Sequence, residues 1–352
     1  MPSARIVVST WLALPLLAFP SIASAAAPNW RSYDQKPDAW FRSPEGETVV
    51  ANVLGNQSPK GCWPKNVDTT KALGTEPAKI QGTFDNGATV GEVRFLARAF
   101  RVTGNEVCRD AVLRTIDTIL EAQYPTGGWP QTYPPGPNYP RYITYNDNTM
   151  VNLMTLLREV IASEAFAFVD DHRRSLAERA FASGVRCILA SQVEVDGRKT
   201  VWCAQHDEVT LAPRPARTYE LVSLSGSESA GILTLLMSLE KPSAEVVKAV
   251  DAGAAWFEKA KLTGIRQTVV NGDKRIVSDP TAPPLWARFY EIGTNTPFFS
   301  GRDGVKKYDI AAIEAERRNG YAWYGTWGSG LLERYARWKE KQAKGAGAGP
   351  GE

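Results

Sequence analysis

Two short segments of the sequence carry a carboxylate followed by a carboxamide. Asp85-Asn86 and Asp147-Asn148 lie 62 residues apart (147 − 85), each at the head of a predicted helix. Side-chain oxygens of Asp and Asn are the ligands that hard cations such as calcium take. We therefore predict a metal site at these two segments if the fold brings them together. The alternative is that each pair only caps its helix, which is the commoner use of these residues.

Arginines that alternate with aromatic residues form the second chemical feature. Two of them, Arg214 and Arg217, lie in a proline-containing segment, and further ones follow at Arg288, at Arg302 and just before Tyr321. The guanidinium group binds carboxylates as a fork. Several such groups beside aromatic rings suit a sugar polymer with one carboxylate on each ring. Alternatively, each arginine is a solvated surface charge or an ion-pair partner.

Other catalytic chemistries lack the residues they need. The sequence has two histidines, and only His206, beside an aromatic loop, could serve a Ser-His-Asp triad, since His172 lies in a charged helical stretch. The motifs G-x-S-x-G, G-x-G-x-x-G and G-x-x-x-x-G-K-[ST] are absent from the sequence. The net charge is +3, but the sequence contains no basic arm and no zinc-finger spacing, so we expect no nucleic-acid partner.

An internal repeat indicates how these residues are positioned. Trp63 in a Gly-Cys-Trp-Pro-Lys segment is matched by Trp129 in Gly-Gly-Trp-Pro-Gln and, more weakly, by Trp202, at spacings of 66 and 73 residues. Each copy is followed by a polar helix start and by apolar residues at helical spacing. The repeat predicts a mainly α-helical, α/α toroid-like barrel of helical hairpins with long loops and little β-structure. Trp63 and Trp129 are candidates for stacking on sugar rings.

The two ends of the chain differ from the repeated part. Arg5 precedes an apolar run and then small residues around Ala23 to Ala25, which predicts a signal peptide over residues 1–25 and a secreted or periplasmic protein. No later segment is apolar enough to cross a bilayer, so we expect no membrane in the mature form. Residues 26–344 read as one catalytic domain, and the Gly- and Ala-rich residues 345–352 as a disordered tail. Nothing indicates an obligate oligomer, so we expect a monomer.

Two smaller features complete the local analysis. Asn271-Gly272 is typical of a tight turn and predicts a small β-hairpin over residues 266–276. Export permits disulfides, and Cys187 and Cys203, which lie sixteen residues apart, could pair. Buried free thiols are the alternative, because connectivity cannot be deduced from spacing.

The sequence resembles the pectate lyases of family ten of the polysaccharide lyases. The similarity extends in order over nearly all of the chain after the predicted signal peptide. The matching stretches are GCWPKNV (61–67), FDNGAT (84–89), GGWPQTY (127–133), YNDNTMV (145–151), ARTYELVSLSGSES (216–229), RFYE (288–291), FSGRDGVKK (299–307) and ERRNGYAW (316–323).

The resemblance implies an α/α toroid and calcium-dependent cleavage of polygalacturonate by β-elimination. It places Asp85, Asn86 and Asp147 around the metal and the substrate. It makes Arg217, in its Ala-Arg-x-Tyr-Glu context, the catalytic base, although Arg214 lies only three residues away and could exchange roles with it. Further substrate-binding candidates are Arg288, Arg302, Arg214, Asn148, Trp63, Trp129 and Tyr321.

The implied chemistry makes a demand on the base. Elimination begins with removal of the C5 proton, which is α to the uronate carboxylate, after cations have neutralised that carboxylate. Arginine has a pKa above ~12, so neighbouring positive charge must lower the pKa of Arg217. Two other functions fit the same residues. One is a glycoside hydrolase with Asp85 and Asp147 as acid and base. The other is a polyuronate-binding protein without catalysis.

Overall fold

The computed structural model describes residues 27–347, and the predicted signal peptide lies outside these described residues. The main helices are α2 (Pro44–Gly55), α3 (Val90–Thr103), α4 (Glu106–Glu121), α5 (Thr149–Ala162), α6 (Asp171–Ser191), α7 (Gly226–Met237), α8 (Ala244–Lys259) and α10 (Trp327–Gly347). Two shorter helices are α1 (Trp30–Asp34) and α9 (Ala315–Gly320). No helix in the described part of the chain combines the length and the apolar character that crossing a bilayer requires.

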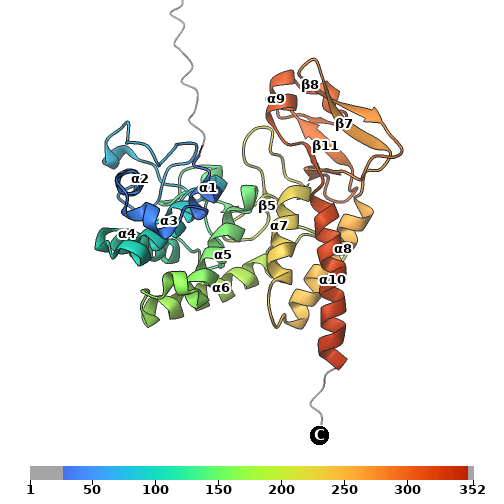
Figure 1. The fold of residues 1–352 in the computed structure, drawn as a ribbon. Helices are drawn as coiled ribbons and strands as arrows, with labels where there is room; N and C mark the ends of the chain where they lie inside the picture. The colour runs from blue at the N-terminus through green and yellow to red at the C-terminus, as the bar shows by residue number, and fades with distance from the viewer. Residues whose placement is uncertain (1–26, 348–352) are drawn as a thin grey trace, which may run out of the picture.

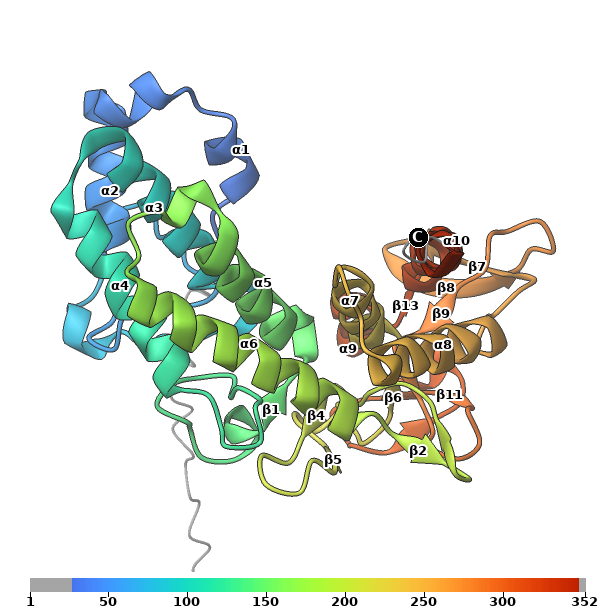
Figure 2. The same cartoon turned by 90° about the horizontal axis from the view of Figure 1, so that it is seen from below.

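The helices are arranged as successive antiparallel pairs. Helix α3 packs on α4, α5 on α6 and α7 on α8, while α10 packs on both helices of the last pair. Neighbouring pairs touch through α3, α5 and α7 on one side and through α4, α6 and α8 on the other. Figures 1 and 2 show an open arc, with α1 and α2 at one end and α10 at the other. The predicted mainly α-helical toroid type is confirmed, but as an arc that does not close into a barrel.

The repeat is built on tryptophans that bind the end of the preceding helix. Each indole is fully buried and donates to a backbone carbonyl one turn or less before the helix ends. The pairs, with their N–O distances, are Trp63 with Val53 (2.6 Å), Trp129 with Ile119 (2.7 Å), Trp202 with Ile188 (2.7 Å) and Trp286 with Phe257 (2.9 Å). Trp286 is a fourth copy, which the sequence comparison missed because its flanking residues differ. A buried indole needs such a partner, so the tryptophan locks each loop to its helix.

This burial corrects one prediction. Trp63 and Trp129 have no exposed ring face, so neither can stack on a sugar. Their apolar rings fill the core of the arc, which is the more favourable place for so large an apolar surface.

Adjacent repeats are joined by regular backbone hydrogen bonds. The amide of Thr83 donates to Trp63 of its own repeat, and that of Phe84 donates to Gln131, two residues after the next tryptophan. In the next repeat, the amide of Thr144 donates to the carbonyl of Trp129, and the amide of Tyr145 donates to the carbonyl of Ala204. These bonds fix where each polar turn lies relative to the next repeat.

The β-structure is limited to short strands in the loops and one longer hairpin. The strands are β1 (Ile143–Thr144), β2 (Glu194–Val195), β3 (Arg198–Lys199), β4 (Gln205–His206), β5 (Pro213–Arg214), β6 (Leu224–Ser225), β7 (Ile265–Val270), β8 (Asp273–Ser278), β9 (Trp286–Ala287), β10 (Phe289–Tyr290), β11 (Pro297–Ser300), β12 (Lys306–Lys307) and β13 (Tyr324–Gly325). They pair antiparallel, in the orders β1-β4-β5, β12-β11-β10-β6, β13-β9, β2-β3 and β7-β8.

The predicted hairpin is confirmed as β7 and β8. Asn271 and Gly272 connect the strands with φ of 51° and 77°, and two successive positive φ values are typical of a tight hairpin turn. A second, smaller apolar cluster lies under this region, around Phe289, Phe299 and Trp323. It supports β10, which follows Arg288, and β11, which precedes Arg302.

The structure also decides two expectations about the cysteines and the C-terminal residues. All four cysteines are buried free thiols, so Cys187 and Cys203 do not pair. Helix α10 continues to Gly347, so the first three residues assigned to a disordered tail belong to the helix. The other residues of that tail lie outside the described part of the chain.

Candidate active site

Two tight turns bring the predicted metal ligands together. The 3-10 turns η3 (Asp85–Gly87) and η5 (Asn146–Asn148) precede α3 and α5 and pack against each other. Asn86 and Asp147 occupy the left-handed region, with φ of 53° and 50°. Asn and Asp tolerate this conformation better than most residues, so their side chains suit the turns. Neither turn caps the following α-helix through a side chain, so capping does not explain the two pairs.

The residues of the two turns correspond to each other differently in the structure than in the sequence. By backbone conformation, Asp85 matches Asn146, and Asn86 matches Asp147. The sequence aligns the two aspartates because Asp-Asn occurs in both, but the structure shifts the match by one residue. The carboxylates of Asp85 and Asp147 therefore have different surroundings.

Asp85 lies beneath the surface and is already neutralised. Its side chain is 2 % exposed and forms an ion pair with Lys65. It also accepts hydrogen bonds from Gln131 Nε2 at 2.8 Å and from the amide of Asn86 at 3.0 Å. A cation could use this carboxylate only by displacing Lys65. Asp147 is the more accessible carboxylate, with its side chain 34 % exposed.

Arg288 lies under Asp147 in a buried polar cluster. Its guanidinium group donates to Asp147 Oδ1 at 3.1 Å and to Asn146 Oδ1 at 3.2 Å, and it pairs with the buried carboxylate of Glu228. Burial alone would lower the pKa of Arg288, but the negative charges of Glu228 and then Asp147 outweigh it, so the net pKa is raised. The group therefore stays a cation.

Glu228 belongs to this buried cluster and was not among the residues predicted from the sequence. It is 2 % exposed, and it hydrogen-bonds to Ser225 as well as pairing with Arg288. Ser225 and Glu228 together form the S-x-x-E pattern of a capping box, which is a readable signal for the start of α7. The pattern predicts a capping role, but nothing local indicates that the glutamate also neutralises an arginine 60 residues away.

Arg217 lies in a separate cluster with Glu220. Its Nε donates to Glu220 Oε2 at 2.7 Å, and its Nη2 donates to Oε1 at 2.5 Å, which makes the pair bidentate. The Tyr321 hydroxyl donates to the same Oε1 at 2.8 Å. Glu220 is 3 % exposed, whereas the Arg217 side chain is 40 % exposed.

The partner sets the protonation of Arg217. Burial would lower its pKa, but the hydrogen bond and the charge of Glu220 outweigh burial, and the net pKa of Arg217 is raised. The pKa of Glu220 is shifted the other way: burial raises it, and the contacts with Arg217 and Tyr321 produce a net lowering. The pair therefore exists as a cation and an anion, and Arg217 is protonated in this conformation.

Tyr219 gathers three arginines around its ring. The guanidinium carbons of Arg217, Arg302 and Arg317 lie 4.9, 5.5 and 4.7 Å from the ring centre. Arg302 and Arg317 share the exposed carboxylate of Glu316. Cations near an aromatic face are stabilised by it, so this cluster can hold more positive charge than its carboxylates cancel.

A pocket of about 470 Å³ opens beside this cluster. Arg217, Thr218, Tyr219 and Arg302 line one wall, and the loop of residues 137–140 lines the other. The predicted residues Arg217 and Arg302 therefore lie on one surface. Arg214 lines no part of it; its Nε and Nη2 instead donate to one oxygen of Asp207, Oδ2, at 2.9 and 2.7 Å.

His206 is excluded from catalysis by its contacts. It is fully buried, its Nε2 accepts from the amide of Cys203 at 3.1 Å, and its Nδ1 contacts the carbonyl of Leu211 at 2.8 Å. Burial lowers the pKa of His206 to about 4, so the ring is neutral and both nitrogens are occupied. The triad that the sequence left open does not form.

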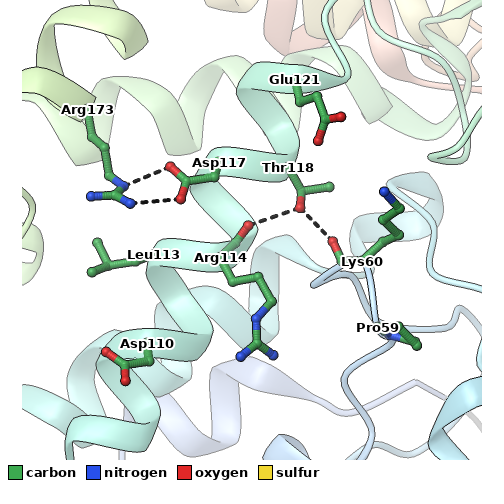
Figure 3. A pocket seen from close by; sticks show the side chains of 9 residues that line it. All are labelled: Pro59, Lys60, Asp110, Leu113, Arg114, Asp117, Thr118, Glu121 and Arg173. Carbon is green, nitrogen blue, oxygen red and sulfur yellow. Dashed lines mark hydrogen bonds and ion pairs between the residues drawn. The ribbon is translucent and has the colours of Figure 1, made fainter.

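Another pocket of about 470 Å³, shown in Figure 3, lies along α4 and shares no residue with the predicted site. An ion pair and hydrogen bonds to backbone carbonyls connect its lining residues. Arg173 forms two bonds to Asp117, at 2.7 and 2.8 Å, and Thr118 donates to the carbonyl of Lys60. The candidate active site is therefore the arginine cluster together with the turns η3 and η5, where the predicted residues lie.

Comparison with known proteins decides the family. The model of the pectic acid lyase family matches residues 57–332, which include every residue described above at the site. The chain belongs to the pectic acid lyase family. It is a polysaccharide lyase, which removes the glycoside hydrolase and the non-catalytic binding protein from consideration.

Solved structures agree with this assignment. A family 10 polysaccharide lyase from Cellvibrio cellulosa is 37 % identical, with a TM-score of 0.77, and the match covers 85 % of this chain and 94 % of that one. An aspartate-to-alanine mutant of a family 10 lyase from the same organism, in complex with trigalacturonic acid, matches with the same values. A search of curated proteins gave no match. The lyase described here therefore shares its fold and its family with an enzyme seen bound to an acidic trisaccharide.

Proposed function

We propose that this lyase cleaves α-1,4-linked polygalacturonate by calcium-assisted β-elimination, with Arg217 as the base. The observation that carries the proposal is the gathering of Arg217, Arg302 and Arg317 around Tyr219, beside a pocket that Arg217 and Arg302 line. The ring of Tyr321 joins this cluster to the turns, because it lies near both Arg217 and Arg288, and Arg288 binds Asp147. Fork-shaped cations on an aromatic surface suit uronate rings, which carry a carboxylate on a largely apolar face.

The oxygen donors of the two turns suit a hard cation, but they supply only part of its ligand shell. Within residues 27–347, no three acidic, histidine or cysteine side chains are grouped closely enough to enclose a metal by themselves. Asp147 and Asn86 present oxygen from adjacent turns, and Asp85 lies behind them. Calcium takes 6–8 oxygen ligands, so the substrate carboxylate and water would complete its shell. When bound, calcium neutralises the uronate carboxylate and so makes the C5 proton more acidic.

The residues of this chain would then act in a defined order. Arg302, which is exposed, binds a substrate carboxylate in place of Glu316. Arg288 keeps Asp147 oriented from below. Arg217 takes the C5 proton, the bond from C4 to the glycosidic oxygen breaks, a C4–C5 double bond forms and the leaving oxygen gains a proton.

Arg217 can act as the base only after it has lost its own proton. Substrate that displaces Glu220 from Arg217 would remove the contact that raises the pKa of Arg217, while nearby cations would lower it. Alkaline conditions should therefore favour the reaction. Asn148, Arg214 and Tyr321 stay as proposed substrate contacts, and export through residues 1–25 and a monomeric state complete the proposal.

The test is release of unsaturated oligogalacturonides from polygalacturonate, followed by their ultraviolet absorbance, with calcium and with a chelator. We expect product only with calcium. Absence of unsaturated product in calcium would refute the proposed reaction. Retained activity in Arg217→Ala would remove Arg217 as the base and leave the family assignment intact.

A further inference from the structure

A second positively charged groove lies away from the arginine cluster. It has a volume of about 830 Å³ and runs between the β2–β3 hairpin and helix α8, which lie close together in Figure 2. Its lining includes the cations Arg198, Lys199, Lys248 and Lys259 and a single acidic residue, Asp196. It shares no lining residue with the pocket beside Arg217.

The cations of this groove are largely uncompensated. Lys199 has a distant partner in Glu194, at 3.9 Å. Within the described residues, Arg198, Lys248 and Lys259 form no ion pair, and all three are exposed. Like charges that face one groove repel each other, so an anionic ligand would stabilise them.

The wall of the groove also contains polar atoms without partners. Trp256 is 6 % exposed, and its indole Nε1, a donor, has no hydrogen-bond acceptor within the described part of the chain. Asn295 Oδ1, an acceptor, is likewise buried and unpaired there. Leaving such groups unsatisfied is costly, but both atoms are shielded from the surface, so the groove offers a ligand its cations and not these two atoms.

We propose that this groove is a second, non-catalytic binding site for an acidic polysaccharide. Carboxylates of the polymer would pair with the lysines and Arg198. The choice of polygalacturonate as the polymer rests on the proposed function. A site that holds a distant part of the chain raises the local concentration of substrate at the catalytic pocket.

The experiment compares two charge reversals of equal size on exposed helical lysines. Lys248→Glu/Lys259→Glu alters the groove, and Lys341→Glu/Lys344→Glu alters the end of α10 by the same change in net charge. Retention is measured by affinity electrophoresis in gels that contain polygalacturonate and a chelator, so that no turnover occurs. Two lost ion pairs at this exposure correspond to a Kd about tenfold higher.

We expect the groove variant to lose about tenfold in affinity relative to the control variant. We also expect its KM to rise on the long polymer, with kcat/KM on trigalacturonate unchanged. In a gel with fully methyl-esterified polymer, which has no carboxylates, the two variants should migrate alike.

Equal retention of the two variants in polygalacturonate would overturn the inference. The inference would also be overturned if the groove variant lost as much retention in gels with dextran sulfate as in gels with polygalacturonate, because the groove would then be a general polyanion surface. The outcomes separate this inference from the proposed function. If the groove variant loses retention but the protein releases no unsaturated product, only the proposed function is refuted. If the protein is fully active as a lyase and the groove variant is retained like the control, only the groove proposal is refuted.

Discussion

Replacing Glu220 with glutamine tests how Arg217 is controlled. The substitution removes the negative charge but keeps the shape of the side chain. An amide oxygen at the position of Oε2 still accepts from the backbone amide and Nε of Arg217, which lie 3.1 and 2.7 Å away. The amide nitrogen at the position of Oε1 meets another donor, Nη2, so that end of the fork is lost.

The expected effect follows from the charge of the partner. A hydrogen bond to a charged group contributes about 1.5–3 kcal/mol, and the 40 % exposure of the Arg217 side chain argues for the lower end. A loss of about 1.4 kcal/mol corresponds to a fall of about one unit in the pKa of Arg217. If Arg217 is the base, more of it is neutral at any pH below its pKa. On the acid side of the optimum, kcat/KM should therefore rise by up to about tenfold.

The assay is a pH profile of kcat/KM for unsaturated product in saturating calcium. Asp207→Asn is the matched control, because it removes the charge that faces Arg214 and keeps the oxygen that accepts from Val209 and Thr210. We expect no rise for this control. A fall by the same factor at every pH in Glu220→Gln would show that Arg217 acts as a cation and not as the base. A rise in Asp207→Asn alone would assign the base to Arg214.

Four further predictions concern stability and binding. Burial raises the pKa of Glu92 to about 7 from 4.5. Between these pH values the folded state therefore binds one more proton than the unfolded state. The free energy of unfolding should fall by about 3 kcal/mol as the pH rises through this window. Denaturant titrations of Glu92→Gln should show that this fall is lost and that the variant is the more stable protein at pH 9. Asp147→Asn should weaken calcium binding at least tenfold in calorimetry with oligogalacturonate present, because one anionic oxygen ligand is lost. Trp202→Phe should cost about 2–4 kcal/mol in the free energy of unfolding, because the Ile188 carbonyl loses its donor and a cavity remains. Arg302→Ala should raise KM for polygalacturonate about tenfold and change kcat little, because its 62 % exposed guanidinium serves binding; an unchanged KM would place Arg302 outside the substrate path.

The sequence by itself determined much of this protein. Helical spacing and polar helix starts predicted the paired helices, because amphipathic periodicity is a local property of the chain. Asn271-Gly272 predicted the β7–β8 hairpin for the same reason. The order of the motifs gave the family, and the residue types gave the set of arginines and the two oxygen-bearing turns.

The tertiary structure alone decided how those residues are paired. Arg288 meets Glu228 and Asp147, and Asp85 meets Gln131, across loops from different repeats. Ion pairs over such separations have no sequence signature, because the partners meet only when the arc assembles.

Burial likewise became visible only in three dimensions. A Trp-Pro segment reads equally well as a sugar platform or as a core anchor, and the arc placed Trp63 and Trp129 in the core. The same assembly shifted the match between the two turns by one residue, because backbone conformation and not residue identity defines equivalence there. The family resemblance, through the local context of Arg217, makes this residue the proposed base. Its protonation depends on Glu220, and the Tyr321 hydroxyl reaches Glu220 from 101 residues away along the chain.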